Sequence, residues 1–302
     1  MYDIIVIGGG PAGMTAALYG LRNGKTVLVI EKSAFGGQIT YSPRVENIPG
    51  FVSVSGNEFA DRFLSQIMDQ GAELEFDEVT EIEASGETKT VKTSMGGEFT
   101  GRAVIIAAGV KHRMLGLPGE EELVGNGISF CAVCDGDFYK GKKVAVAGGG
   151  NSAFVEAVLL QEKCSEVVML QDLPDFTADK KLQQDLLKHD NVKSRFNTRF
   201  ISIVIENDSF KGIEIENKLT NERETIICDG LFVAIGLIPE NGIFAGYADL
   251  DERGYFLSDE STLTKTPGVF VAGDCRRKDV RQVTTACADG AMAALAACAY
   301  LR

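Results

Sequence analysis

Residues 3–32 read DIIVIGGGPAGMTAALYGLRNGKTVLVIEK, and residues 143–172 read KVAVAGGGNSAFVEAVLLQEKCSEVVMLQD. The two stretches align glycine on glycine without a gap. Each holds an apolar run, a Gly-rich turn, a segment rich in small residues and a second apolar run. Continuous apolar runs are typical of buried parallel strands, which need a crossover helix between them. The repeat therefore predicts two β-α-β units of one design.

The glycines of the first unit indicate a dinucleotide site. Gly8, Gly10 and Gly13 form a G-x-G-x-x-G pattern between the first apolar run and the helical segment. Such glycines permit a tight turn and let the backbone approach a pyrophosphate at the helix N-terminus. Glu31 ends the second apolar run, where an acid can accept a hydrogen bond from a ribose hydroxyl. Strand, turn, helix and acid together favour dinucleotide binding over a purely structural turn.

The second unit carries a variant of the same pattern, Gly148, Gly150 and Ala153. Alanine at the third place still allows close packing of helix and strand, and it is common in nicotinamide sites. Gln171 stands where Glu31 stands in the first unit, and Asp172 follows it. We therefore expect two dinucleotide sites that need not hold the same cofactor.

Each unit is followed by segments of alternating polarity, which predict a β-meander. They are residues 72–85, 88–94 and 102–109 after the first unit, and 199–208, 211–217 and 230–236 after the second. This order predicts an α/β fold of two Rossmann-like, three-layer dinucleotide-binding domains, the second inserted into the first. Gly- and Pro-rich joints at 109–119 and 236–246 suggest the bounds. The first domain is expected to be discontinuous, at 1–113 and 246–302, and the second to span 114–245.

Composition limits the class of protein. Hydrophobic residues make up 45% of the 302 residues and the net charge is −13, which is typical of a globular chain and disfavours nucleic acid or a membrane as partner. We see no leader peptide before the strand at Tyr2, and no uninterrupted apolar run of the ~18 residues that a membrane span needs. The seven cysteines are unlike a secreted disulfide framework, so a cytoplasmic protein is expected. Five of them are interpreted as having no redox role: Cys164, Cys228, Cys275, Cys287 and Cys298.

Residues 128–141, ISFCAVCDGDFYKG, contain a second chemical motif. Cys131 and Cys134 are two residues apart, and Asp135 follows at once. A structural zinc site needs four ligands, and the sequence has no second Cys-x-x-Cys and no His pair, so no metal is expected. Two buried spectator thiols are disfavoured because the acidic residues 135–137 are a poor core sequence. The pattern favours a redox dithiol/disulfide with a carboxylic acid to protonate the departing thiolate.

Six motifs in order resemble those of the low-molecular-weight thioredoxin reductases: GGGPAG, GGQI, VENIPG, CAVCDG, GGGNSA and VFVAGDCRRKDVRQVTTACADG. The resemblance covers essentially the whole chain. It implies an FAD-dependent homodimer that reduces the disulfide of a thioredoxin-like protein. It also implies that the nicotinamide domain rotates relative to the FAD domain, with the two joints as hinges.

The resemblance assigns roles residue by residue. Cys134 would face the flavin, Cys131 would attack the partner disulfide, and Asp135 would be the acid. A helix opening at residues 281–283 would direct its N-terminus to the electron-rich edge of reduced flavin. The expected FAD-binding residues are Gly8, Gly10, Pro11, Ala12, Gly13, Glu31, Lys32, Gly37, Gln38, Asn47, Val79, Ala108, Gly109, Gly273, Asp274, Arg281, Gln282 and Val283.

The sequence departs from the family after the second strand of the nicotinamide unit. NADPH-dependent members carry a basic HRR…R stretch that binds the 2′-phosphate, whereas residues 171–177 read QDLPDFT. Two carboxylates in place of the cations make NADPH unlikely and favour NADH, with Gln171 or Asp172 accepting from the 2′-hydroxyl. The stretch also resembles NADH-using flavoprotein subunits of alkyl hydroperoxide reductases. The expected nicotinamide-site residues are Gly148, Gly150, Asn151, Ser152, Ala153, Gln171, Asp172 and Gly236.

Three alternatives stay open. The electron donor could be ferredoxin, although relatives of that kind tend to lose the glycine pattern that persists here. The same scaffold could oxidise a small dithiol with oxygen. A non-catalytic, flavin-binding redox sensor is a third reading, which the presence of Cys131, Cys134 and Asp135 together disfavours.

Overall fold

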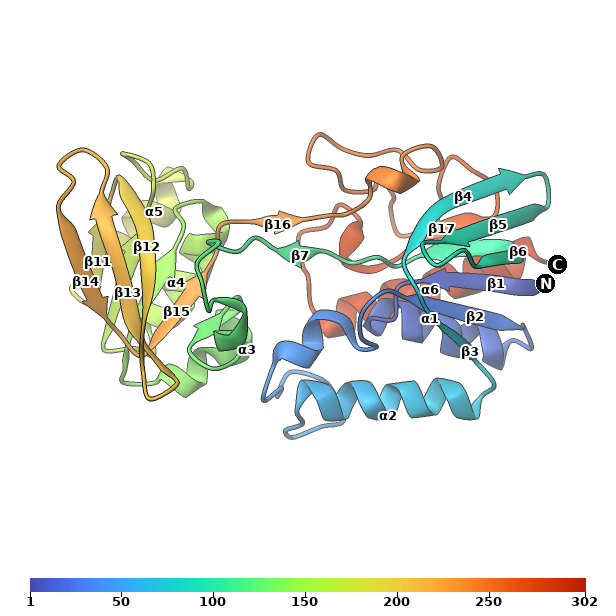
Figure 1. Cartoon of the computed structure of the whole chain (residues 1–302), viewed down its shortest axis with the longest axis horizontal. Helices are drawn as coiled ribbons and strands as arrows, with labels where there is room; N and C mark the ends of the chain where they lie inside the picture. Colours follow the sequence, from blue (N-terminus) through green and yellow to red (C-terminus); the bar gives the residue numbers. More distant parts are fainter. The chain divides into compact units, whose positions relative to one another are not determined.

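The computed structural model describes all 302 residues, except for the side chain of Ser85. The chain forms two compact units, Met1–Lys111 with Ile238–Arg302, and His112–Leu237. The second unit is inserted into the first, and the two connections pair as β7 (Lys111–His112) and β16 (Leu237–Ile238) (Figure 1).

The return connection therefore comes earlier in the chain than the bound expected at residues 245–246. Asn241 explains the difference. Its buried amide donates hydrogen bonds to the carbonyls of Gly254 and Cys275, both at 2.9 Å, and so attaches the chain to the first unit from that point on.

A parallel sheet forms the centre of the first unit. Its strands, in spatial order, are β3 (Glu73–Phe76), β2 (Val27–Glu31), β1 (Tyr2–Ile7), β6 (Glu98–Ile106) and β17 (Val269–Val271). Strands β4 (Val79–Ser85) and β5 (Thr88–Thr93) form an antiparallel hairpin. Strand β5 of this hairpin pairs with the first half of β6. The carboxyl ends of the parallel strands share one edge, which is where ligands bind in such folds.

The two faces of this sheet are covered by different layers. Helices lie over one face, where Val6 and Val29 are buried: α1 (Pro11–Arg22), α2 (Gly56–Asp69) and α6 (Val283–Tyr300). The β4–β5 hairpin and the segment around η4 (Gly242–Phe244) cover the other face, where Ile5 and Leu28 are buried. Successive strand residues point to opposite faces, so a strand covered on both sides is apolar throughout.

The second unit repeats this plan. Its parallel strands, in spatial order, are β11 (Val192–Arg195), β10 (Glu166–Leu170), β9 (Lys143–Ala147), β15 (Gly230–Val233) and β8 (Ile128–Ser129). Helices α4 (Asn151–Gln161) and α5 (Lys180–Leu187) pack on one face. The antiparallel sheet of β12 (Thr198–Glu206), β13 (Ser209–Asn217) and β14 (Arg223–Ile227) packs on the other. The prediction of two Rossmann-like, three-layer units, one inserted into the other, is confirmed.

Short helical turns complete both units. They are η1 (Gly37–Tyr41) and η5 (Gly273–Cys275) in the first unit, and η2 (Glu121–Leu123), α3 (Ala132–Asp135) and η3 (Gly136–Tyr139) in the second.

The segment 72–85, expected to open the first meander, divides into two strands with different partners. Residues 73–76 join the parallel sheet beside β2, and the antiparallel hairpin begins only at Val79. Asp77 makes the break, because its carboxylate accepts hydrogen bonds from the Ser94 hydroxyl at 2.6 Å and the Glu78 N–H at 2.7 Å.

Helix α6 is long and apolar enough, by length and composition alone, to cross a membrane. In this fold it packs against α1, with Ala293, Ala294 and Ala297 fully buried. Its Asp289 is also buried and forms an ion pair with Arg276 at 2.8 Å. These contacts identify α6 as a core helix of the first unit.

Candidate active site: a disulfide and two dinucleotide cradles

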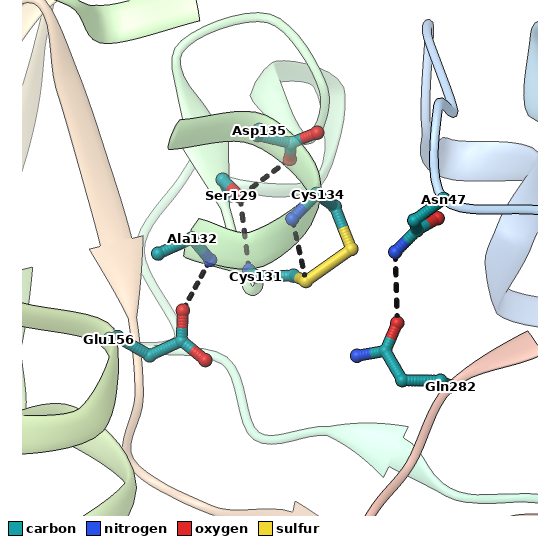
Figure 2. The surroundings of a disulfide bond; sticks show 8 residues. All are labelled: Asn47, Ser129, Cys131, Ala132, Cys134, Asp135, Glu156 and Gln282. Atoms are coloured by element: carbon teal, nitrogen blue, oxygen red, sulfur yellow. Dashed lines mark hydrogen bonds between the residues drawn. A yellow bond between two sulfur atoms is a disulfide. The ribbon is translucent and has the colours of Figure 1, made fainter. Parts of the chain in front are cut away.

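The two cysteines of the Cys-x-x-Cys motif form a disulfide at the start of a one-turn helix (Figure 2). The Cα atoms of Cys131 and Cys134 are 5.3 Å apart. Strand β8 ends at Ser129, Cys131 is extended, and the single turn of α3 returns Cys134 towards it. The Cys134 main-chain N–H donates to Cys131 Sγ across 3.1 Å. That donor would stabilise a thiolate at Cys131 more than one at Cys134.

Asp135 ends the same turn and is buried. Its Oδ2 accepts a hydrogen bond from the Ser129 hydroxyl at 2.6 Å, whereas its buried Oδ1 has no hydrogen-bond partner among the described residues. Burial raises the pKa of Asp135, and the Ser129 hydroxyl opposes that rise. A carboxyl held towards its protonated form can donate a proton to a leaving thiolate. This is the role predicted from the sequence.

Ser129 is a site residue that the sequence did not single out. Besides donating to Asp135, its Oγ accepts the main-chain N–H of Cys131 at 3.1 Å (Figure 2). One hydroxyl therefore connects the acid to the backbone of the disulfide. Nothing in the local pattern distinguishes this serine from others in turns.

Glu156 is a second residue that the sequence did not single out. It belongs to α4, and its carboxylate accepts a hydrogen bond from the main-chain N–H of Ala132 (Figure 2). Burial raises the pKa of Glu156; the Ala132 N–H lowers it, and the negative charge of Asp135 raises it further. A signal existed in the sequence, because Glu156 lies at helical spacing within the buried stripe of Ala153 and Leu160.

The first Gly-rich turn is shaped by close backbone approach. A Cβ on Gly8 would lie 2.3 Å from the carbonyl oxygen of Ala107, and one on Gly13 would lie 1.8 Å from that of Gly8. By contrast, nothing lies within 4 Å of a Cβ built on Gly10, which caps the start of α1. Positions 8 and 13 thus need glycine for packing, and the space above position 10 can admit a pyrophosphate at the helix N-terminus.

Glu31 is fixed beside this turn. Its Oε2 accepts the Gly9 N–H at 2.6 Å, and its Oε1 accepts the Ser33 N–H at 2.8 Å. Oε1 also accepts the Ser33 hydroxyl at 3.0 Å, so Oε2 is the carboxylate oxygen that can accept a further hydrogen bond. The geometry suits an acid that binds ribose hydroxyls at the end of the second strand.

The loop from η5 to α6 carries two buried polar atoms that lack a hydrogen-bond partner. Asp274 Oδ1 and Arg281 Nε have no hydrogen-bond partner among the described residues. Burial raises the pKa of Asp274 to about 6, against the opposing charges of Lys278 and Arg281. Nearby, Asn47 Nδ2 donates to Gln282 Oε1 at 3.1 Å (Figure 2). Orphaned buried groups of this kind indicate a polar ligand that completes the site.

Asp289 of α6 fixes the position of this loop. Its carboxylate accepts the Gly273 N–H at 3.0 Å and pairs with Arg276 at 2.8 Å and Lys278 at 3.0 Å. This buried cluster was not predicted from the sequence, since Asp289 lies 11 residues beyond Lys278 and contacts the loop only in the folded chain.

These features of the first unit fit FAD. Glu31 would hold the adenosine ribose, the Gly10 turn the pyrophosphate, and Asp274 the ribityl chain. Lys32 is engaged elsewhere, in ion pairs with Glu240 at 2.7 Å and Glu78 at 3.2 Å. The remaining predicted residues all belong to the same unit: Pro11 and Ala12 in α1, Gly37 and Gln38 in η1, Val79 at the start of β4, Ala108 and Gly109 after β6, Gly273 in η5, and Val283 at the start of α6.

The second Gly-rich turn has the same construction. A Cβ on Gly148 would lie 2.5 Å from the Ala234 carbonyl oxygen, and α4 begins at Asn151 directly after Gly150. Asn151 exchanges hydrogen bonds with Asp179, at 2.8 and 3.0 Å. The other predicted residues lie at this turn or at the strand ends beside it: Ser152 and Ala153 in α4, and Gly236 after β15.

Gln171 and Asp172 are not arranged as Glu31 is. The buried Gln171 amide donates to the Asp175 carbonyl and accepts the Asp172 N–H, both at 3.1 Å. Lys218, from the turn after β13, donates to the Asp172 carbonyl at 2.9 Å and lies 3.6 Å from its carboxylate. This cation was not predicted from the sequence, because Lys218 lies 46 residues beyond Asp172 and approaches it only in the folded chain.

No group of three or more His, Cys, Asp and Glu side chains that could hold a metal ion occurs among the described residues. Five cysteines outside the disulfide are free, and Cys164, Cys228, Cys275 and Cys298 among them are buried. The disulfide joins the other two cysteines, Cys131 and Cys134.

Comparison with known proteins agrees with this geometry. The family model of the pyridine nucleotide-disulphide oxidoreductases matches residues 2–290. The chain belongs to that family and, within it, to the low-molecular-weight thioredoxin reductases. The thioredoxin reductase of Listeria monocytogenes is 39% identical over 97% of this chain and 92% of its own length, and that of Bacillus subtilis is 39% identical over 97% and 93%. The crystal structure of thioredoxin reductase from Streptococcus pyogenes matches with a TM-score of 0.93 at 36% identity, covering 100% of this chain and 98% of its own.

Membership of this family relates the two Gly-rich turns and the disulfide to one kind of redox chemistry. The chain is an oxidoreductase of the flavoprotein type, and the family implies FAD and a pyridine nucleotide as cofactors.

Proposed function

We propose that this protein reduces the disulfide of a thioredoxin-like protein through its Cys131–Cys134 pair, with NADH as electron donor. The observation that supports this proposal most directly is the Cys131–Cys134 disulfide at the start of α3. It lies next to Asp135, a buried acid whose pKa is raised by burial. FAD, when bound, supplies a two-electron carrier between the nicotinamide and this disulfide.

The exchange chemistry follows from the contacts around the two sulfurs. In the dithiol form, the Cys131 thiolate attacks the partner disulfide and forms a mixed disulfide, releasing one partner thiol. Cys134 then attacks Cys131 Sγ, which restores the Cys131–Cys134 disulfide and releases the second partner thiol. Overall, one dithiol and one partner disulfide become one disulfide and one partner dithiol. The hydrogen bond from the Cys134 N–H to Cys131 Sγ supports Cys131 as the attacking sulfur.

Asp135 is the acid in this scheme. Its carboxyl can give a proton to the thiolate that leaves and recover it in the next half-reaction. The orphaned Oδ1 supports this role, because it leaves one carboxyl oxygen able to carry the transferred proton.

The preference for NADH rests on the charge of the Asp172 segment. A 2′-phosphate at the end of β10 would meet the Asp172 carboxylate, and the nearby cation, Lys218, is already paired with that carboxylate. The free 2′-hydroxyl of NADH would instead donate a hydrogen bond to it. Ferredoxin as donor is the alternative, and the intact glycine turn at Gly148–Gly150 argues against it.

Val133, between the two cysteines, is 53% exposed, so its side chain is accessible to a partner that approaches the disulfide. A homodimer and a cytoplasmic location are further parts of this proposal, and both come from the resemblance and the composition.

The test uses the FAD-loaded protein without oxygen. Mixing with NADH is expected to bleach the flavin absorbance rapidly, whereas NADPH at the same concentration bleaches it slowly. Adding an oxidised thioredoxin should then restore the absorbance. Absence of bleaching with either nucleotide would direct the search to ferredoxin. Bleaching that only oxygen reverses would identify a dithiol oxidase and overturn the reductase proposal.

A further inference from the structure

The turn that holds the disulfide, residues 131–135, is here called the redox turn. One of its main-chain N–H groups donates a hydrogen bond to the carboxylate of Glu156. Ala132, the residue after Cys131, is the first residue of α3, and its N–H donates to Glu156 (Figure 2). The first N–H groups of a helical turn have no partner within the turn. In other settings such donors stabilise a neighbouring thiolate. Here a side chain from a separate helix, α4, accepts the first of them.

The charges around this turn are mostly negative. Burial has the largest effect on the pKa of Glu156 and raises it. The negative charge of Asp135 raises that pKa further. Lys163 is the cation that packs near the turn, and it pairs with Asp137 at 2.8 Å. The phenol of Tyr139 is neutral, with its pKa raised to about 12 chiefly by burial. A thiolate formed at Cys131 therefore lies in a negative environment.

We propose that Glu156 is a positioning residue of the disulfide exchange, which holds the redox turn through Ala132 and makes the Cys131–Cys134 pair a stronger reductant. The inference rests on the proposed function and deepens it. Negative charge beside the pair destabilises the thiolate of the reduced form and leaves the uncharged disulfide unaffected. The reduced pair thus passes its electrons on more readily, in contrast to oxidants whose reduced form is stabilised.

Two substitutions separate charge from hydrogen bonding. Glu156→Gln keeps a carbonyl oxygen that can accept from Ala132 but removes the charge. Glu156→Ala removes both. Glu162→Gln is the matched control, because it removes one exposed carboxylate at the C-terminal end of the same helix.

The measurement is an equilibrium between the FAD-loaded protein and glutathione, without oxygen, at a pH of about 8.5, where an ordinary thiol is partly ionised. Two glutathione thiols reduce one Cys131–Cys134 disulfide and become one glutathione disulfide. After acid quenching and alkylation, the peptide that contains both cysteines is quantified by mass spectrometry. The assay contains neither a nicotinamide nor a protein partner, so a failure of the proposed function would leave its result intact.

Glu156→Gln is expected to shift this equilibrium about tenfold towards the dithiol, which corresponds to a potential about 30 mV more positive. Glu156→Ala should shift it in the same direction and also speed hydrogen exchange of the Ala132 amide. Glu162→Gln should match the wild type. An equilibrium constant for Glu156→Gln within twofold of the wild type would overturn the charge effect, and unchanged Ala132 exchange in Glu156→Ala would overturn the positioning role.

Discussion

The hydroxyl of Ser129 donates a 2.6 Å hydrogen bond to Asp135 and at the same time accepts the main-chain N–H of Cys131 at 3.1 Å. This single side chain connects the Asp135 carboxyl with the backbone of the disulfide. Because the bond is to the carboxylate form, it lowers the pKa of Asp135, whereas burial raises it.

Ser129→Ala is therefore expected to raise the pKa of Asp135 further. The acid then stays protonated to higher pH, so the alkaline limb of the pH profile for thioredoxin reduction should move to higher pH. The measurement is kcat/KM for oxidised thioredoxin across pH, with the rate of flavin bleaching by NADH as a control. A limb that moves to lower pH would contradict the assignment of Asp135 as the acid.

Asp135→Asn removes the proton that the leaving thiolate needs. Turnover of the partner disulfide should fall about 10²-fold or more, the usual contribution of general acid catalysis. Flavin bleaching by NADH should be unchanged. Asp137→Asn, two residues along and exposed, serves as the control and should retain most of the activity.

Cys134→Ser and Cys131→Ser should each abolish reduction of thioredoxin while leaving flavin bleaching by the donor intact. They differ in what they trap. Cys134→Ser retains the attacking sulfur and should accumulate a mixed disulfide with the partner, visible as a single covalent adduct by mass spectrometry. If Cys131→Ser forms that adduct and Cys134→Ser does not, the two sulfurs have the opposite roles.

Asp172→Asn should improve the use of NADPH. The substitution removes the carboxylate that a bound 2′-phosphate would meet under the proposed function, and it releases Lys218 from its ion pair. We expect kcat/KM for NADPH to rise about tenfold, which is about 1.4 kcal/mol of transition-state stabilisation, with a smaller change for NADH. Asp175→Asn neutralises another carboxylate of the same segment and controls for net charge. Equal effects of both variants would show that only the overall charge matters.

Asp289→Ala should damage the FAD-binding unit. Asp289 and Arg276 form a buried ion pair, with side chains 7% and 4% exposed, and removing one partner of such a pair costs about 3–5 kcal/mol. Urea unfolding and the FAD content of the purified protein provide the measurement. Asp249→Ala, which breaks an exposed pair with Lys265, should cost less than about 1 kcal/mol.

Asp274 is expected to make the unfolding free energy of the FAD-free protein depend on pH. Burial raises its pKa from 3.8 to about 6, so the folded state binds this proton more tightly than the unfolded state does. Its contribution to stability is full below pH 3.8 and is lost as the pH rises through 6. The difference in unfolding free energy between the wild type and Asp274→Asn should follow that course. A difference that instead grows with rising pH would contradict it.

Much of this protein was predictable from local sequence. The turn at Gly8–Gly13 and its copy at Gly148–Ala153 each specify a strand, a turn and a helix within about 30 residues, because close backbone approach excludes a Cβ at Gly8, Gly13 and Gly148. The disulfide also follows from adjacent residues, since two cysteines separated by two residues can meet within one helical turn. The acid Asp135 lies next to them for the same reason.

Contacts between distant segments decided the rest. Glu156 reaches the redox turn from another helix, and Lys218 reaches Asp172 from the turn after β13. Asp289, in α6, accepts a hydrogen bond from Gly273 of η5. Asn241 determines where the chain returns to the first unit, through carbonyls that follow it in sequence. The sequence by itself determined the repeated scaffold and the reactive pair, because those depend on short-range backbone geometry. Only the tertiary structure decided which charges and hydrogen bonds surround that pair, because burial and charge neighbours arise when separate elements pack together.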